Sequence, residues 1–141
     1  RVLHALEVCI QTGRTYTSFR SNTKQDRPFN IIKIALNRER EELYERINAR
    51  THVMIADGMI EEALKVYDKR DLNALNTVGY KELFEYLEGL VTLDEAIFKI
   101  QSNTRKYARK QLTWFKRDKD VSWFHPNETK DILNYIDTYL V

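Results

Sequence analysis

The sequence contains few residues that cross-link or break a chain. Among its 141 residues are one cysteine, two prolines and four glycines. A single cysteine, Cys9, excludes an internal disulfide framework and is typical of a reducing compartment, so we expect a cytoplasmic location. Because Pro and Gly are scarce and no low-complexity stretch or repeat is present, we expect long elements joined by short connections.

Long apolar runs and recognisable active-site motifs are also absent. No stretch approaches the roughly 20 apolar residues of a membrane-spanning helix, and no signal-peptide core is present, so we expect no contact with a membrane. His4, His52 and His125 are far apart and lack a Cys or carboxylate grouping with metal-ligand spacing. There is no Gly-rich phosphate loop. The residues alone therefore predict neither a metal site nor a self-contained active site.

The hydrophobic pattern predicts a mainly α fold with one or two short strands. With 43% hydrophobic residues, the chain can bury one core, so we expect residues 1–141 to form a single unit. Loops are expected over residues 21–28 and 71–78. Helical spacing predicts helices over residues 2–12, 38–57, 59–69, 80–87 and 93–117, and a last helix after residue 127. Asn37 is expected to cap the second of these helices, Thr92 and Glu95 to form a capping box at the fifth, and Asn127 to cap the last. In the last helix, Ile132, Leu133, Ile136 and Leu140 are expected to face inward.

Two short segments are predicted to be strands. Residues 29–36 are β-branched and almost entirely apolar, which predicts a strand buried on both faces. Residues 121–124 alternate weakly and are expected to form a short edge strand. Both resemble pieces of a larger α/β sheet. The chain also starts inside a helical pattern without an initiator Met, which suggests a fragment of a longer protein.

The most informative segment is strongly cationic. Residues 99–119 contain eight Lys or Arg and one acid, Asp118, a net charge of +7, whereas the rest of the chain has 15 basic and 20 acidic residues, a net charge of −5. A polyanion such as RNA would therefore be drawn to this segment by local potential rather than by net charge.

The predicted helix over residues 93–117 has polar groups inside its apolar stripe. Thr104 and Gln111 lie there among residues expected in the core, including the aromatic side chains of Tyr107, Trp114 and Phe115. Gln and Thr can read base edges while cations bind phosphates, a mixture that favours RNA. The alternative is an ordinary solvated basic face. No acidic residue lies between Lys99 and Arg117, which favours binding, because solvated helices usually interleave charges of both signs.

Arg50 lies past the middle of the helix predicted over residues 38–57, near its apolar side. Its guanidinium could lie along the surface or pair with a carboxylate. It could instead bind a phosphate through two parallel hydrogen bonds. Spacing alone favours the surface role.

Four segments resemble the tRNA dimethylallyltransferase family, also called tRNA isopentenyltransferases. Residues 104–115 (TRKYARKQLTWF) are close to the family pattern TR..A(K/R)(R/K)Q.TW(F/L). The other matches are residues 5–8 (ALEV) followed by Thr12-Gly13, residues 40–58 with LYERI at 43–47, and residues 77–83 (TVGYKEL). They occur in the family's order and spacing along nearly the whole chain.

The resemblance implies the C-terminal half of a P-loop-type α/β enzyme, whose phosphate-binding loop and general-base Asp lie upstream and outside these residues. It implies transfer of a dimethylallyl group from dimethylallyl diphosphate to N6 of the adenosine adjacent to the anticodon. Mg²⁺ assists, with ligands outside this chain, and the target base is flipped into a channel. We expect the chain alone to be inactive and monomeric.

The resemblance also implies roles for particular residues. Arg50 would be the catalytic residue that binds diphosphate. The sequence departs from the family pattern at His4, Thr51-His52 and Asn76. The alternative from a different class is a freestanding helical RNA-binding or adaptor module without catalysis. The residues expected to contact the tRNA anticodon stem-loop are Thr104, Arg105, Lys106, Tyr107, Ala108, Arg109, Lys110 and Gln111, with a second stretch at Asp71, Leu72, Asn73, Ala74, Leu75 and Asn76.

Overall fold

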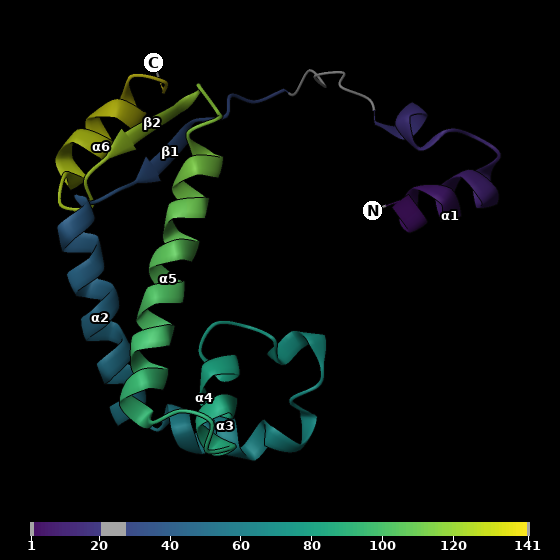
Figure 1. The fold of residues 1–141 in the computed structure, drawn as a ribbon. Helices are drawn as coiled ribbons and strands as arrows, with labels where there is room; N and C mark the ends of the chain where they lie inside the picture. Colours follow the sequence, from purple (N-terminus) through teal and green to yellow (C-terminus); the bar gives the residue numbers. More distant parts are fainter. Residues whose placement is uncertain (1, 21–27, 141) are drawn as a thin grey trace. The chain divides into compact units, whose positions relative to one another are not determined.

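A computed structural model describes residues 2–20 and 28–140 of the chain (Figure 1). Its contacts divide the chain into two compact units, residues 1–31 and 32–141, which are described separately. That the whole chain behaves as one unit stays a prediction. Within the described residues, no helix combines the length and apolarity needed to cross a membrane.

The first unit consists of a helix and a short turn of 3₁₀ helix. Helix α1 (Val2–Thr12) ends where the sequence predicts, at Gly13, whose φ of 66° favours glycine and whose amide donates to the Cys9 carbonyl at 2.9 Å. The 3₁₀ helix η1 (Tyr16–Phe19) follows. The loop predicted over residues 21–28 lies, apart from its last residue, outside the described residues.

The second unit is built around two long helices that run side by side, α2 (Arg40–Ala56) and α5 (Leu93–Phe115) (Figure 1). Helix α2 starts three residues after the predicted cap at Asn37, and Glu39 is its N-cap residue. The prediction was wrong because the Asn37 amide donates to the Phe124 carbonyl at 3.0 Å. Asn37 therefore continues a strand pairing instead of starting the helix.

A small core forms where α3 (Met59–Val66) and α4 (Tyr80–Leu87) meet α5. The helix predicted over residues 59–69 is divided into α3 and the 3₁₀ helix η2 (Tyr67–Lys69), and the predicted loop after it contains a third 3₁₀ helix, η3 (Asn73–Leu75). Helix α4 has the predicted bounds. The buried side chains of the core are those of Met59, Ala63, Leu83, Phe84 and Ile100.

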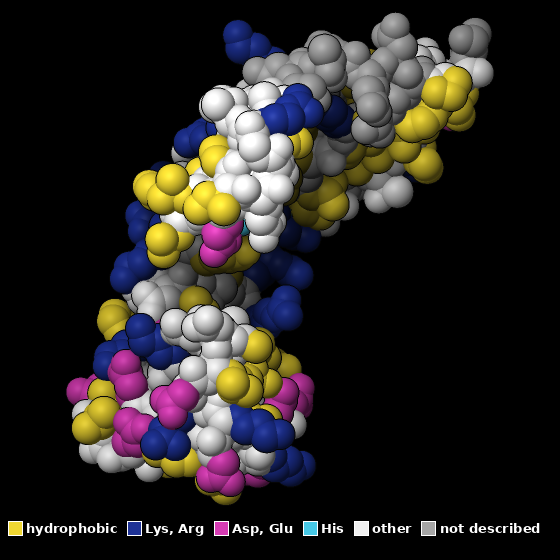
Figure 2. Space-filling model, turned by 90° about the vertical axis from the view of Figure 1, so that its right-hand side faces the viewer, with side chains coloured by type: hydrophobic (Ala, Val, Ile, Leu, Met, Phe, Trp, Pro, Cys, Tyr) yellow, Lys and Arg dark blue, Asp and Glu magenta, His cyan; other side chains and the backbone are white. Residues whose placement is uncertain are grey.

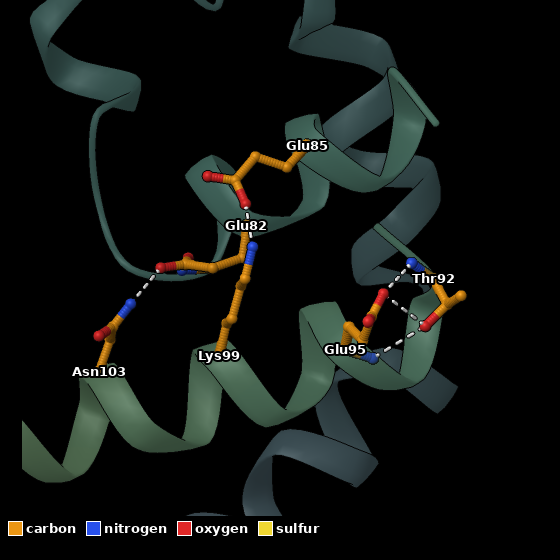
Figure 3. A network of polar contacts seen from close by, with 7 residues as sticks. Glu82, Glu85, Thr92, Glu95, Lys99 and Asn103 are labelled. Carbon is orange, nitrogen blue, oxygen red and sulfur yellow. Dashed lines mark hydrogen bonds and ion pairs between the residues drawn. The ribbon is translucent and has the colours of Figure 1, made fainter. Parts of the chain in front are cut away.

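Polar contacts fix the first half of α5 (Figure 3). The predicted capping box is confirmed: the Thr92 hydroxyl accepts from the Glu95 amide, and the Glu95 carboxylate accepts from the Thr92 amide at 2.8 Å. The buried Glu82 carboxylate accepts from the Gly79 amide and from the Asn103 side chain, each at 2.7 Å. Helix α4 is thereby tied to α5.

The sheet of the described residues has two parallel strands, β1 (Lys33–Leu36) and β2 (Val121–Phe124). Both predicted strands exist, but β1 is shorter than predicted at its N-terminal end, because its parallel partner begins at Val121, opposite Lys33, and offers no strand residue opposite residues 29–32. The expectation that this strand is buried on both faces was wrong, since Leu36 is 55% exposed. Among the described residues, no third strand pairs with the outer edge of β1 or of β2.

Helix α6 (Thr129–Asp137) follows β2. Its N-cap residue is Glu128 rather than the predicted Asn127, because the Glu128 carboxylate accepts from the His125 amide at 2.7 Å and holds the turn from the strand. Two of the four residues expected to face inward, Leu133 and Leu140, are exposed. The two-stranded sheet gives α6 a narrow surface against which to pack.

Candidate nucleic-acid interface

The second half of α5 carries cations that no carboxylate neutralises. Lys106, Arg109 and Lys110 are exposed, and none of them forms an ion pair with a described residue. Lys99, in the first half of the same helix, pairs with Glu85 at 2.7 Å. In Figure 2, Lys and Arg side chains flank the middle of the view, whereas both signs mix at its lower end, where α3 and α4 lie. The predicted RNA-binding segment is therefore a cationic surface.

Arg105 differs from these cations because the protein holds its guanidinium in place. Its Nη1 donates to Asn48 Oδ1 at 2.7 Å, and its Cζ lies 5.7 Å from the centre of the Tyr44 ring. Both partners belong to α2. The sequence analysis did not find this contact, since Asn48 and Arg105 are 57 positions apart and no local pattern links them.

The aromatic side chains of this half are exposed, although the sequence predicts them in the core. Tyr107 is 58% exposed and Trp114 is 64% exposed in the described chain. They lie beyond the end of the α3–α4 core, which contacts only the first half of α5. The Thr104 hydroxyl donates to the Ile100 carbonyl at 2.7 Å, so its burial inside the stripe is compensated within the helix.

A groove of about 1090 Å³ separates the sheet from the second half of α5. Its walls are largely apolar, with Leu36 and Trp123 from the strands and Trp114 and Phe115 from the helix. Gln111, the second polar residue of the stripe, is exposed and lines the groove. The sequence pattern places Trp123 on a strand but gives no sign that it faces α5.

An ion pair fixes one wall of this groove. The Lys33 ammonium lies 2.6 Å from the Asp118 carboxylate, and this hydrogen bond lowers the pKa of the Asp118 carboxyl. The pair joins β1 to the turn between α5 and β2. Asp118, the one acid of the cationic segment, is therefore occupied by a strand residue rather than by a cation of α5.

Arg50 is exposed on α2 and makes no side-chain hydrogen bond or ion pair with a described residue. At about 100° per residue it lies about 200° around the helix from Asn48, which contacts α5. Arg50 therefore lies on the side of α2 that faces away from α5 and from the predicted tRNA-contacting residues of that helix. The neighbouring Thr51 is buried, and its hydroxyl donates to the Ile47 carbonyl at 2.9 Å.

The second predicted contact stretch, residues 71–76, forms an exposed turn around η3. Only Leu75 is half-buried, where it packs against the core. The stretch carries no cation and one acid, Asp71. A contact with RNA here would rely on hydrogen bonds rather than on charge, and it stays a prediction.

Among the residues that the structure describes, no group of three or more His, Cys, Asp or Glu side chains could hold a metal ion. The donor set that Mg²⁺ prefers, several oxygen ligands around one point, is therefore not assembled by this part of the chain.

Comparison with known proteins identifies the family. The family model described as IPP transferase matches residues 1–118. The chain is 62% identical over 136 residues to tRNA dimethylallyltransferase 1 of Phocaeicola vulgatus, and this alignment covers 96% of the chain and 45% of that protein. It is 55% identical over 141 residues to tRNA dimethylallyltransferase 2 of Parabacteroides distasonis, covering all of this chain and 47% of that protein.

A solved structure shows the same fold. The full-length tRNA isopentenylpyrophosphate transferase of Bacillus halodurans is 39% identical, with a TM-score of 0.74 over 99% of this chain and 45% of that one. The chain thus spans less than half the length of these relatives. The mainly α fold with two short strands and the resemblance carried by the four motifs are both confirmed, and the chain belongs to the IPP transferase family.

Proposed function

We propose that this chain is the tRNA-docking and diphosphate-binding portion of a tRNA dimethylallyltransferase. The enzyme would transfer a dimethylallyl group from dimethylallyl diphosphate to N6 of the adenosine adjacent to the anticodon. The observation that carries the proposal is the row of unpaired cations on the second half of α5, in a chain 62% identical to a protein named tRNA dimethylallyltransferase.

The cationic surface supports docking of the tRNA anticodon stem-loop. Each Lys or Arg that contacts a phosphate releases counterions from the RNA, so affinity depends on unpaired cations such as Arg109 and Lys110. Phosphate contacts alone do not read sequence. Gln111, exposed at the groove, can donate to and accept from a base edge, which is how unstacked bases are read in RNA.

Arg50 supports the proposed chemistry. When the adenosine N6 attacks C1 of dimethylallyl diphosphate, the C1–O bond breaks and its electron pair goes to the diphosphate oxygens. A guanidinium with no described acid partner can bind these oxygens through two hydrogen bonds and stabilise the charge as it develops. The N6 proton leaves to a base that the family resemblance places outside this chain.

Mg²⁺, when bound, would neutralise diphosphate charge, and the resemblance places its ligands outside this chain. The residues that the structure describes supply the guanidinium and the docking surface. A cytoplasmic location and a monomeric state stay predictions.

The docking proposal is tested by measuring the affinity of the purified chain for an anticodon stem-loop RNA over a range of salt concentrations. We expect log K to fall with log salt at a slope corresponding to about three to five phosphate contacts. A duplex RNA of equal charge serves as the control and should bind more weakly. A slope near zero would contradict the proposal.

The chemistry is tested by adding dimethylallyl diphosphate. The chain alone should transfer no prenyl group, whereas the full-length protein should. RNA binding without transfer by the full-length protein would instead favour the RNA-binding module without catalysis.

A further inference from the structure

The contact between Arg105 and helix α2 has an unusual chemical composition. The half-buried guanidinium is oriented by two neutral groups, the amide oxygen of Asn48 and the ring face of Tyr44. These two residues are four apart on α2, so their side chains lie on one face of the helix. A hydrogen bond at 2.7 Å and a ring within about 6 Å are enough to fix the direction of the guanidinium.

Other cations that tie elements of this unit together are held by carboxylates. Lys33 of β1 pairs with Asp118, which follows α5, and Lys99 of α5 pairs with Glu85 of α4. A carboxylate orients a cation well but cancels its charge. Helix α2 is rich in acids, at Glu41, Glu42 and Glu45, yet the side chain opposite Arg105 is an amide. Arg105 is therefore fixed in position while it keeps its full charge.

Most of the hydrogen-bonding capacity of Arg105 is unused. A guanidinium has five N–H donors, and Asn48 accepts from one of them. In the described part of the chain, no buried side-chain nitrogen lacks a partner, and Arg105 makes no other side-chain hydrogen bond. Its remaining nitrogens therefore reach solvent. They form a fork of the kind that binds a phosphate through two hydrogen bonds.

We infer that Asn48 and Tyr44 are positioning residues that hold Arg105 ready to bind a phosphodiester of the RNA backbone. This inference rests on the proposed RNA-binding function. Arg105 is the first cation of the row that continues through Lys106, Arg109 and Lys110. The RNA phosphate that it binds would therefore lie at one end of the docked RNA strand. Because the side chain is ordered on folding, less conformational freedom is lost when RNA binds.

The inference is tested with Asn48→Asp. A carboxylate can accept the same hydrogen bond but neutralises the guanidinium. We expect the salt slope of stem-loop binding to fall by about 0.7–0.9, one phosphate contact, and the affinity at 0.1 M salt to fall about five- to eightfold. The melting temperature should be unchanged or higher. Asn48→Ala, which frees Arg105 without neutralising it, should lower affinity but leave the slope unchanged.

Ala49→Asp is the matched control, since it adds the same charge to an exposed position next to Asn48. It should leave the slope within error of the wild type. Arg105→Gln should lower the slope as much as Asn48→Asp, and the double variant should lower it no further. This second variant keeps the test decisive if Asn48→Asp fails to fold.

An unchanged slope in Asn48→Asp or in Arg105→Gln would overturn the inference while leaving RNA docking intact. An equal fall in Ala49→Asp would also overturn it, because the effect would then be general repulsion. A wild-type slope near zero would overturn the proposed function together with this inference.

Discussion

The two halves of α5 share one helix but differ in what their side chains contact. In residues 93–104, Ala96 and Ile100 are buried, and Lys99 and Asn103 are bound by glutamates of α4. In residues 105–115, Trp114 is exposed and Arg109 and Lys110 have no described acid partner. Residues 93–104 attach the helix to the rest of the unit and are called the anchored half. Residues 105–115 expose charged and aromatic side chains and are called the presenting half.

This division explains how a charged segment stays helical. Arg105 and Arg109, like Lys106 and Lys110, are like charges four residues apart, an arrangement that destabilises an isolated helix. Starting a helix is costly, but adding residues to an existing one is not. The anchored first half, with its capping box, supplies that start, so the second half can carry repelling charges.

The largest effect is expected from breaking the anchored half. Leu83→Ala removes a fully buried side chain from the core beneath α5 and should lower the free energy of unfolding by about 3–4 kcal/mol. Urea denaturation followed by circular dichroism measures this loss. Leu64→Ala, at a 60% exposed position of α3, is the matched control and should cost less than about 1 kcal/mol. Equal losses would mean that the core lies elsewhere.

The second prediction concerns Arg50, which lies on α2 and is proposed to bind diphosphate. In the full-length protein, Arg50→Ala should lower the rate of prenyl transfer by roughly 10²–10³ because it removes a group that stabilises the leaving diphosphate. Affinity for tRNA should change less than about twofold, since Arg50 is on the side of α2 away from α5. Arg46→Ala, one turn earlier on α2 and also exposed, is the control. An unchanged rate in Arg50→Ala would remove its proposed role.

The presenting half is tested with Arg109→Ala combined with Lys110→Ala. Loss of two phosphate contacts should flatten the salt slope of stem-loop binding by about 1.4–1.8 and lower affinity at 0.1 M salt roughly 25- to 60-fold. Stability should not fall, because neither side chain has a described partner. Lys65→Ala with Lys130→Ala removes the same charge elsewhere. If both pairs have the same effect, the surface acts only through overall charge.

The smallest effect concerns pH and the start of α5. The Thr92 amide donates to the Glu95 carboxylate and lowers its pKa below the ordinary value of 4.5. A group whose pKa is lowered on folding stabilises the protein above its unfolded pKa, and this stabilisation is lost as pH falls through the folded value. The melting temperature of the wild type should therefore drop more than that of Glu95→Gln between about pH 5 and pH 3. Asp94→Asn is the control, and parallel curves for Glu95→Gln and the wild type would contradict the prediction.

The sequence predicted features that depend on neighbouring residues and missed those that depend on distant ones. The capping box at Thr92 and the bounds of α4 are local patterns, and both are confirmed. Asn37 is a good cap locally, but a strand 87 residues away takes its amide. The length of β1 was likewise decided by its partner strand.

The same limit applies to the candidate site. The cationic composition of residues 99–119 is visible in the sequence, and so is the motif that implies RNA binding. Periodicity placed Trp114 in the core because it reports which face is apolar, not whether anything covers that face. The contact of Arg105 with Asn48 depends on how α2 and α5 pack, which no spacing within either helix encodes.

The difference between the two halves of α5 is tested most directly by measuring lysine acetylation, residue by residue, with and without the anticodon stem-loop RNA. Lys106 and Lys110 belong to the presenting half, while Lys99 is bound by Glu85 in the anchored half of the same helix. We expect RNA to protect Lys106 and Lys110 at least several-fold and to leave Lys99 unchanged. Equal protection of all three lysines, or protection of none, would contradict the proposal that the second half of α5 docks RNA.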